Sequence, residues 1–91
     1  MIYRSKAEII SAILQTTDSG ASITRIMYGS YLSYTLTKKY VNFLMENNMV
    51  VYEEKIHRYK TTEEGKKFTR MYGEISKMFN SKLNKPPEFS K

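Results

Sequence analysis

The sequence predicts one small domain that is mainly α-helical and contains a single small β-hairpin. Apolar residues recur at helical spacing in several stretches, and a serine or threonine precedes each of these stretches as a potential helix cap. A short segment near residue 50 is instead rich in β-branched and aromatic residues, which is typical of strands. A chain of 91 residues buries only a small core, so we expect one domain.

The first helix is expected over residues 6–17. Ser5 and Glu8 have the spacing of a capping box, and the apolar residues of the stretch 9–14 repeat at helical spacing behind it. The segment Asp18 to Gly20 contains residues that favour a turn and should end this helix.

A second, short helix should begin after a cap at Ser22. We expect Gly29 to end it, with a two-residue break at Gly29 and Ser30, because glycine commonly follows the last turn of a helix. The residues expected on its buried side are Ile23, Ile26 and Met27.

A third helix should begin after a cap at Ser33, and its two faces differ in chemistry. The apolar residues expected to be buried are Leu36, Tyr40, Phe43 and Leu44. The opposite face is expected to carry Tyr34, Thr35, Lys38, Lys39 and Asn42. This second face contains no acidic residue.

The remainder of the chain predicts a hairpin followed by a long helix. In "MVVYEEKIHRYKTT", strand-forming residues surround a polar centre at 53–57. Thr62 can then cap a helix with Glu63 and Glu64 in its first turn, where carboxylates favour the positive end of the helix dipole. An apolar stripe continues along this helix until Pro86 prevents its continuation.

The charge distribution indicates a polyanionic partner. Fifteen Lys and Arg residues stand against nine Asp and Glu residues, which gives a net charge of +6. Asp18 and Glu46 are consecutive carboxylates, so the stretch 19–45 contains only the charges of Arg25, Lys38 and Lys39. A solvated surface usually mixes both signs, and we therefore expect the anion-binding face in this half of the chain.

Three helices, a hairpin and a final helix give the element order of a winged helix-turn-helix. In this fold the third helix enters the major groove of DNA, and an acidic residue on its outer face would repel the phosphates. Lysine can reach guanine or phosphate, and asparagine can pair with adenine. The residues expected to bind DNA are Ser22, Thr24, Arg25, Tyr31, Ser33, Tyr34, Thr35, Lys38, Lys39, Asn42, Lys55 and Arg58.

The segment "TRIMYGSYLSYTLTKKYVNFLM" at residues 24–45 resembles small archaeal winged-helix DNA-binding proteins, which are chromosomal, nucleoid-associated or regulator-like. The segments "AEIISAIL" at 7–14 and "TTEEGKKF" at 61–68 fit the same family. The resemblance implies a homodimer, formed by an antiparallel coiled coil of the last helix, that binds double-stranded DNA in the cytoplasm. The excess apolar surface of that helix favours the same pairing. The residues expected at the dimer contact are Phe68, Met71, Tyr72, Ile75, Met78, Phe79 and Leu83.

We divide the chain into a DNA-binding domain at residues 1–65, a dimerisation helix at 66–84 and a disordered tail at 85–91. The chain contains no cysteine and one histidine, without a glycine-rich phosphate loop, so an enzyme is not expected. We expect no cofactor, no metal and no membrane contact, and no small-molecule effector is evident from the sequence.

Several residues have alternative interpretations. The polar face of the third helix could be an ordinary solvated surface, and Arg25 could bind a phosphate or stabilise the domain. Tyr28, Tyr31 and Tyr40 are expected to pack at the edge of the domain rather than stack on bases. His57 is expected in solvent on the wing. A winged helix can also be a protein-interaction module without specific DNA binding, and a DNA binder can be a regulator or an architectural protein.

Overall fold

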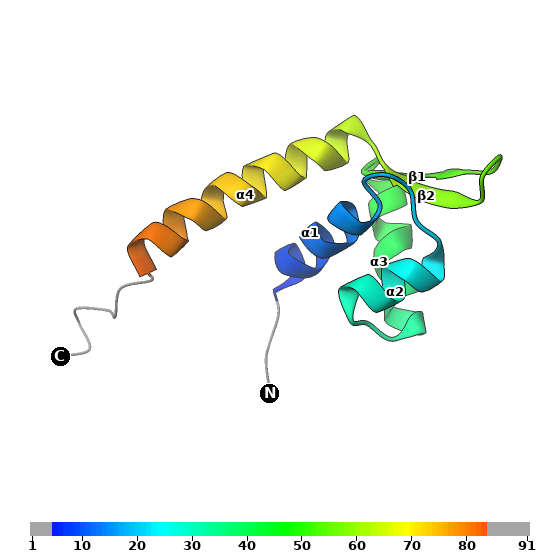
Figure 1. Ribbon diagram of the computed structural model, residues 1–91, viewed down its shortest axis with the longest axis horizontal. Helices are drawn as coiled ribbons and strands as arrows, with labels where there is room; N and C mark the ends of the chain where they lie inside the picture. Colours follow the sequence, from blue (N-terminus) through cyan, green and yellow to red (C-terminus); the bar gives the residue numbers. More distant parts are fainter. Residues whose placement is uncertain (1–4, 84–91) are drawn as a thin grey trace.

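The structure is a computed structural model that describes residues 5–83, with the side chains of residues 5–78. The expected tail at 85–91 lies outside the described residues. The elements, in order, are α1 (Lys6–Thr16), α2 (Ile23–Ser30), α3 (Tyr34–Glu46), β1 (Val50–Glu53), β2 (Arg58–Thr61) and α4 (Glu63–Leu83), as Figure 1 shows. The expected fold class, mainly helical with a small hairpin, is confirmed.

Each helix begins at the cap that the sequence predicts. At α1, the Ser5 hydroxyl accepts from the Glu8 amide at 3.1 Å, and the Ser5 amide donates to the Glu8 carboxylate at 2.8 Å. The hydroxyls of Ser22, Ser33 and Thr62 accept amide hydrogen bonds at the starts of α2, α3 and α4. These bonds satisfy amides that have no partner inside the helix and fix where each helix starts.

The expected end of α2 at Gly29 is wrong. Gly29 and Ser30 are both helical, and the chain leaves the helix at Tyr31, whose backbone is left-handed with φ 56° and ψ 47°. Gly29 instead allows α2 to approach α1, because a Cβ at this position would lie 2.9 Å from the Thr16 hydroxyl oxygen. The glycine thus serves the packing of two helices rather than the turn.

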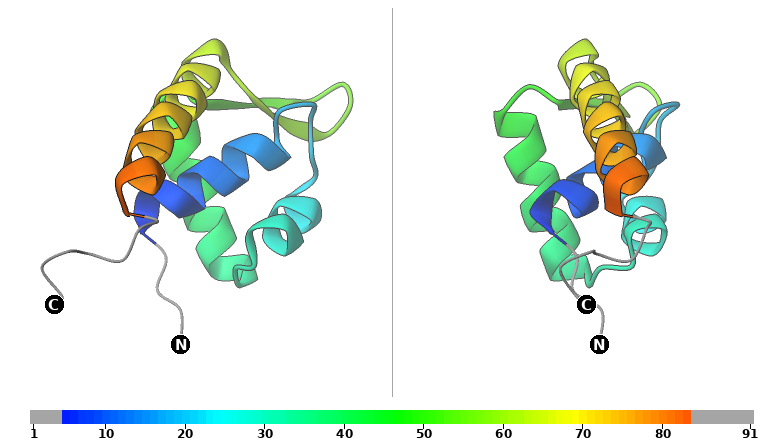
Figure 2. Two further views of the ribbon diagram at one scale, coloured as in Figure 1. Left: turned by 60° about the vertical axis from the view of Figure 1, so that its left-hand side comes forward. Right: turned by 90° about the vertical axis from the view of Figure 1, so that its left-hand side faces the viewer.

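The core lies around α1, which contacts α2, α4 and β2. In the right-hand view of Figure 2, α3 lies on one side of α1 and α4 on the other. The buried apolar residues of this core are Ile9, Ile13, Leu14, Ala21, Ile26, Val41, Leu44 and Val50. Because they come from all three N-terminal helices and the first strand, the body of the domain is a single packed unit.

The buried face of α3 differs from the expected one. Leu36 is 40% exposed and Phe43 is 49% exposed, so the expectation that both are buried is wrong. Thr37 and Val41 are buried instead, next to the correctly predicted Leu44. Thr37 is tolerated there because its hydroxyl donates to the Ser33 carbonyl oxygen at 2.7 Å, which leaves its methyl group to pack.

The hairpin forms the wing of the fold and is joined to the helical body by a third segment. β1 and β2 pair antiparallel with Val50 opposite Thr61. Ala21, in the loop between α1 and α2, exchanges two backbone hydrogen bonds with Tyr59, at 2.8 and 2.9 Å. This bridge was not predicted from the sequence, and it fixes the base of the wing against the start of α2.

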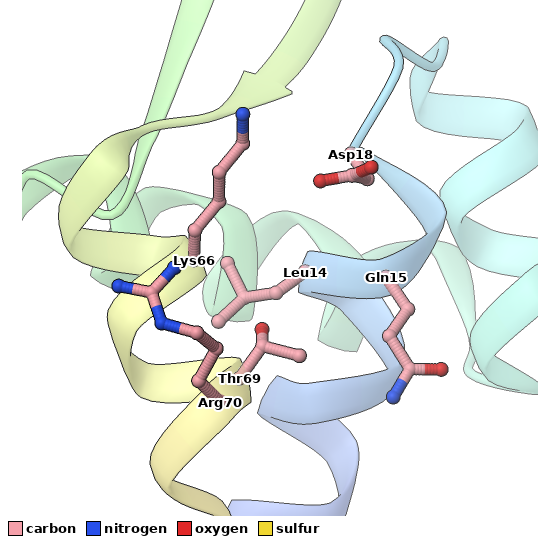
Figure 3. A pocket seen from close by; sticks show the side chains of 6 residues that line it. All are labelled: Leu14, Gln15, Asp18, Lys66, Thr69 and Arg70. Carbon is pink, nitrogen blue, oxygen red and sulfur yellow. The ribbon is translucent and has the colours of Figure 1, made fainter. Parts of the chain in front are cut away.

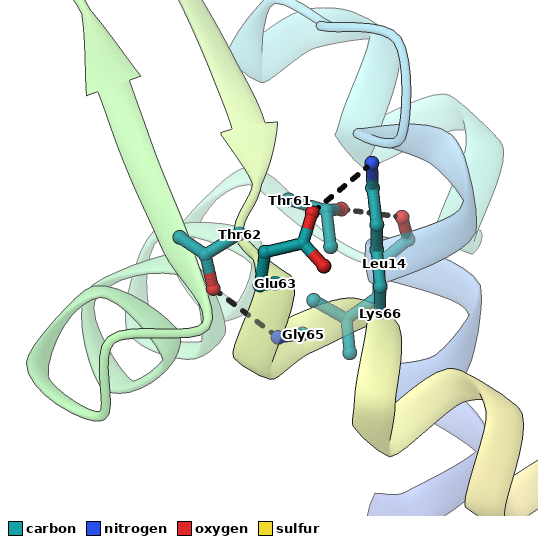
Figure 4. Close-up of polar contacts among 6 residues, drawn as sticks. All are labelled: Leu14, Thr61, Thr62, Glu63, Gly65 and Lys66. Carbon is teal, nitrogen blue, oxygen red and sulfur yellow. Dashed lines mark hydrogen bonds and ion pairs between the residues drawn. The ribbon is translucent and has the colours of Figure 1, made fainter.

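The first turns of α4 are fixed by hydrogen bonds, which Figure 4 shows in part. The Thr61 hydroxyl donates to the Leu14 carbonyl oxygen at 2.7 Å and lies 2.7 Å from the Thr17 hydroxyl. The Thr62 hydroxyl both donates to the Asn48 carbonyl oxygen and caps α4. Beyond these turns, α4 extends away from the other elements (Figure 1).

Candidate nucleic-acid interface

The outer face of α3 presents polar side chains in one row. Thr35, Lys39 and Asn42 are exposed and follow one another at intervals of four and three residues, which places them on the same side of the helix. Lys38 lies beside this row and is half-buried. Glu46 continues the row at the C-terminal end, about 16 Å from Thr35 along the helix axis. Only the N-terminal two-thirds of the face is therefore free of carboxylates.

Two apolar side chains that were expected in the core lie at the surface instead, on one flank of this row. Leu36 and Phe43 lie seven positions apart, two helical turns, on the side of α3 that faces away from the core. Phe43 also lines a groove of about 200 Å³ between α1 and α3, together with Ile10 and Tyr40. The signal that could have identified them is the alternative stripe of Thr37, Val41 and Leu44, which has helical spacing as well.

The start of α2 offers a second polar surface. Thr24 and Arg25 are exposed, and the first turns of α2 and α3 contain no acidic residue. The capping hydroxyls of Ser22 and Ser33 accept from helix amides, so their own protons can be donated to an anion. Positive helix ends without neighbouring carboxylates favour phosphate binding.

Tyrosines dominate the corner between α2 and α3. Tyr28 is 69% exposed, Tyr31 87% and Tyr34 55%, so the expectation that Tyr28 and Tyr31 pack against the domain is wrong. Tyr40 does pack against the core, as expected. At Tyr31 the error has a local cause, because the left-handed backbone turns its side chain into solvent while Ser30 before it is buried and Leu32 after it packs against the core.

The wing carries both signs of charge. Lys55 and His57 are exposed at its turn, as expected, next to Glu53 and Glu54. The Arg58 guanidinium donates to the carbonyl oxygen of His57 at 3.2 Å, and this contact stabilises the turn. The Lys55 ammonium at the turn has no hydrogen bond or ion pair among the described residues.

The residues expected at the dimer contact divide into two groups along α4. Phe68 packs against the core of its own domain, and Tyr72 stacks on it with 6.2 Å between ring centroids. Met71, Ile75 and Met78 are each about half exposed or more. The side chains of Phe79 and Leu83 lie outside the described part of the molecule.

A groove of about 460 Å³ lies between α1 and α4, on the other side of α1 from α3. Figure 3 shows Asp18 across this groove from Lys66 and Arg70, with Leu14 at its floor. The groove mixes both signs of charge and in this respect differs from the carboxylate-free surface of α2 and α3. The described residues contain no cluster of acidic and histidine side chains that could hold a metal, and within residues 5–83 no helix has the length and apolar character of a membrane span.

These features define the chain as a winged helix-turn-helix protein. It belongs to the winged helix-turn-helix family, whose model matches residues 3–80. Its sequence is 35% identical, over 80 residues, to the uncharacterised protein MJ0287 of Methanocaldococcus jannaschii, and the match covers 87% of this chain and 80% of that protein. The fold is similar to the crystal structure of Sso10a-2, a DNA-binding protein from Sulfolobus solfataricus, with a TM-score of 0.79 and 26% identity over 89% of this chain and 87% of the other.

Proposed function

We propose that this protein binds double-stranded DNA as a homodimer, with α3 as its recognition helix. The observation that carries the proposal is the row Thr35, Lys39 and Asn42 on the outer face of α3, in a stretch without carboxylates. Membership of the winged helix-turn-helix family and the likeness to a DNA-binding protein support it.

In the proposed complex, the N-terminal two-thirds of α3 lies in the major groove. Lys39 and Asn42 reach base edges, while Lys38, Thr35 and the serine caps of α2 and α3 contact phosphates. Leu36 and Phe43, exposed beside this row, offer apolar contact to thymine methyl groups. Glu46 lies at the far end of the helix, where it limits how deeply the C-terminal half enters the groove.

We propose that the homodimer contact is formed by the C-terminal half of α4. Met71, Ile75 and Met78 follow the alternating four and three spacing of a coiled-coil seam and expose their apolar side chains. In Figure 2, α4 lies on the opposite side of α1 from α3, so a second copy on α4 leaves both recognition helices accessible. Two linked half-contacts then add through effective concentration.

The recognition face is tested by reversing its charge. We expect Lys38→Glu with Lys39→Glu to abolish binding to a duplex of about 20 base pairs at moderate salt, measured by fluorescence anisotropy. The control is Lys66→Glu with Lys67→Glu, which changes the net charge equally but on α4. Equal losses in the two variants would mean that net charge alone drives binding, and the assignment of α3 would be wrong.

The dimer is tested by light scattering at tens of micromolar protein. We expect a dimer for the native chain and a monomer for Ile75→Glu with Met78→Glu. The dimer of this variant would bury unpaired carboxylates in the seam, which costs free energy. The control is Arg70→Glu with Lys77→Glu, at exposed polar positions of the same helix. A monomeric native chain would overturn this part of the proposal.

DNA binding by this protein is compatible with two biological roles, that of a transcription regulator and that of a chromosomal architectural protein. They differ in the ratio of specific to non-specific affinity, which genome-wide occupancy measures as sharp sites or broad coverage. The apolar groove beside Phe43 favours a second candidate, a module that binds another protein. Titration with duplex DNA at two salt concentrations discriminates, because only a DNA binder loses affinity steeply as salt rises.

A further inference from the structure

Tyr31 occupies a position that its own chemistry does not favour. Its backbone has φ 56°, in the left-handed region where a residue with a Cβ is strained and where glycine or asparagine is the usual choice. The ring does not offset this strain by packing, because the residue is 87% exposed. Among the described residues, its hydroxyl has no hydrogen-bond partner. The Tyr31 backbone ends α2, but that role does not require an aromatic side chain, so the strained and exposed ring suggests a contact with a ligand.

Two further exposed tyrosines lie close to it in the chain. Tyr28 is in the last turns of α2 and Tyr34 is the first residue of α3, so three tyrosines border one corner of the molecule. No ring contact joins any of them to another aromatic residue in the part of the chain that the structure describes. Each ring therefore has a face that is available for stacking.

A hollow of about 420 Å³ lies beside Tyr28, between the end of α1 and α2. Its lining residues are Gln15, Thr16, Ser19, Arg25, Tyr28 and Gly29. The Gln15 amide nitrogen donates to the Ser11 hydroxyl at 3.2 Å, which leaves its amide oxygen as an acceptor. The hollow thus combines an aromatic ring, a cation and neutral hydrogen-bonding groups.

The surrounding charge selects the partner. The stretch 19–45 that contains the three tyrosines has Arg25, Lys38 and Lys39 and no carboxylate. The positive charge of this stretch is complementary to the negative charge of a phosphate backbone. Aromatic rings beside cations are the combination that holds unpaired bases, because every base has a face that can stack and every linkage carries a negative charge. In a duplex those faces are already stacked on neighbouring bases, so the rings gain most from a single strand.

We propose that the corner formed by Tyr28, Tyr31 and Tyr34, with Arg25, is a binding site for unpaired bases of single-stranded nucleic acid. A base stacks on Tyr28 at the mouth of the hollow, and Arg25 binds the adjoining phosphate. Tyr31 and Tyr34 stack on neighbouring bases of the same strand. This activity is additional to duplex binding by α3.

The test compares single-stranded and duplex oligonucleotides on the same protein. Labelled oligothymidine of about 15 nucleotides is titrated by fluorescence anisotropy, with oligouridine of the same length as the arm that separates DNA from RNA. We expect the native protein to bind at least one of them, and Tyr28→Ala to weaken that binding by about fivefold to a hundredfold. Tyr28→Phe, which keeps the ring and removes the hydroxyl, is expected to retain it.

Three controls keep the result interpretable. Tyr52→Ala removes a tyrosine on the wing, outside the carboxylate-free stretch, and is expected to leave single-strand affinity unchanged. Tyr28→Ala is expected to bind duplex DNA as the native chain does, since Tyr28 is not among the proposed duplex contacts. Tyr31→Gly is expected to weaken single-strand binding without lowering the melting temperature, because glycine relieves the left-handed strain.

The proposal is overturned if the native protein binds neither single strand, or if Tyr28→Ala binds them as tightly as the native chain. It is also overturned if Tyr28→Phe loses as much affinity as Tyr28→Ala, since the hydroxyl rather than the ring would then be the contact. A loss of duplex binding in the α3 charge-reversal variant, with single-strand binding retained by the tyrosines, would separate the two activities.

Discussion

The two halves of α4 belong to one continuous helix but have opposite surroundings. In the first half, Gly65 is buried against the body of the domain, and a Cβ there would lie 2.5 Å from the Met49 carbonyl oxygen. In the second half, a Cβ at Gly73 would meet no atom within 4 Å. The same residue type therefore marks a fixed end and a free end of one element. The difference indicates that folding of the domain needs only the first half, which leaves the second available for a partner.

The chemistry of the two halves follows the same division. The first half follows the hydrogen-bonded threonines Thr61 and Thr62 and contains Phe68, which packs against the core. The second half exposes Met71, Ile75 and Met78. A row of exposed apolar side chains commonly marks a surface that another molecule covers. For this reason we propose the dimer contact in this half.

The largest expected effect of a substitution in this comparison is at Gly65. We expect Gly65→Ala to destabilise the domain by about 3 kcal/mol, because the new methyl group meets the Met49 carbonyl oxygen and the Thr61 side chain, and backbone must move. The higher helix propensity of alanine offsets only about 1 kcal/mol of this cost. Urea unfolding followed by circular dichroism measures it. A stability equal to that of the native chain would mean that Gly65 does not lie against the Met49 carbonyl oxygen.

The next effect is expected at Thr61. The Thr61 hydroxyl donates to the Leu14 carbonyl oxygen and lies 2.7 Å from the Thr17 hydroxyl, whose one proton can go to Thr61 or to the Ile13 carbonyl oxygen at 2.9 Å. We expect Thr61→Val to cost about 1 to 2 kcal/mol, since it removes a buried hydrogen bond to the Leu14 carbonyl oxygen, while the Thr17 hydroxyl keeps the Ile13 carbonyl oxygen as a partner. Thr69→Val is the matched control, because Thr69 is half-buried and bonds only within its own helix, to the Gly65 carbonyl oxygen. Similar losses in both variants would argue against a special role for the buried pair.

Much of the fold could be predicted from the sequence because local signals determine it. Ser5, Ser22, Ser33 and Thr62 each cap the helix that was expected to follow them, since a cap depends on residues three positions apart. The hairpin follows from strand-forming residues on both sides of a polar turn. These features need no knowledge of what packs against what.

The errors lie where tertiary contacts decide. Gly29 looked like a helix end, but the approach of Thr16 from α1 requires a glycine inside the helix. Leu36 and Phe43 looked like core residues, but the packing of α3 against α2 and β1 buries the stripe of Val41 instead. The exposure of Tyr31 could not be predicted either, because it depends on the left-handed backbone at that residue. The DNA contacts of α3 stay a proposal that the charge-reversal variants test.

The smallest expected effect is a gain of stability at Gly73. Glycine inside a helix is less favourable than alanine by about 1 kcal/mol, and no neighbour within the described structure crowds this position. We expect Gly73→Ala to raise the melting temperature by a few degrees. Gly20→Ala is the opposite control, because Gly20 has φ 98° and an alanine there would be strained.

Gly73→Ala also tests where the dimer contact lies. On the helix, Gly73 points to the side opposite the row of Met71, Ile75 and Met78, so a methyl group there should not obstruct a partner bound to that row. We therefore expect the variant to remain dimeric in light scattering and to dimerise at least as tightly, because a stiffer outer half loses less entropy on pairing. If Gly73→Ala instead becomes monomeric while its circular dichroism shows more helix, the glycine itself lies in the contact, and the seam must be reassigned to the other side of α4.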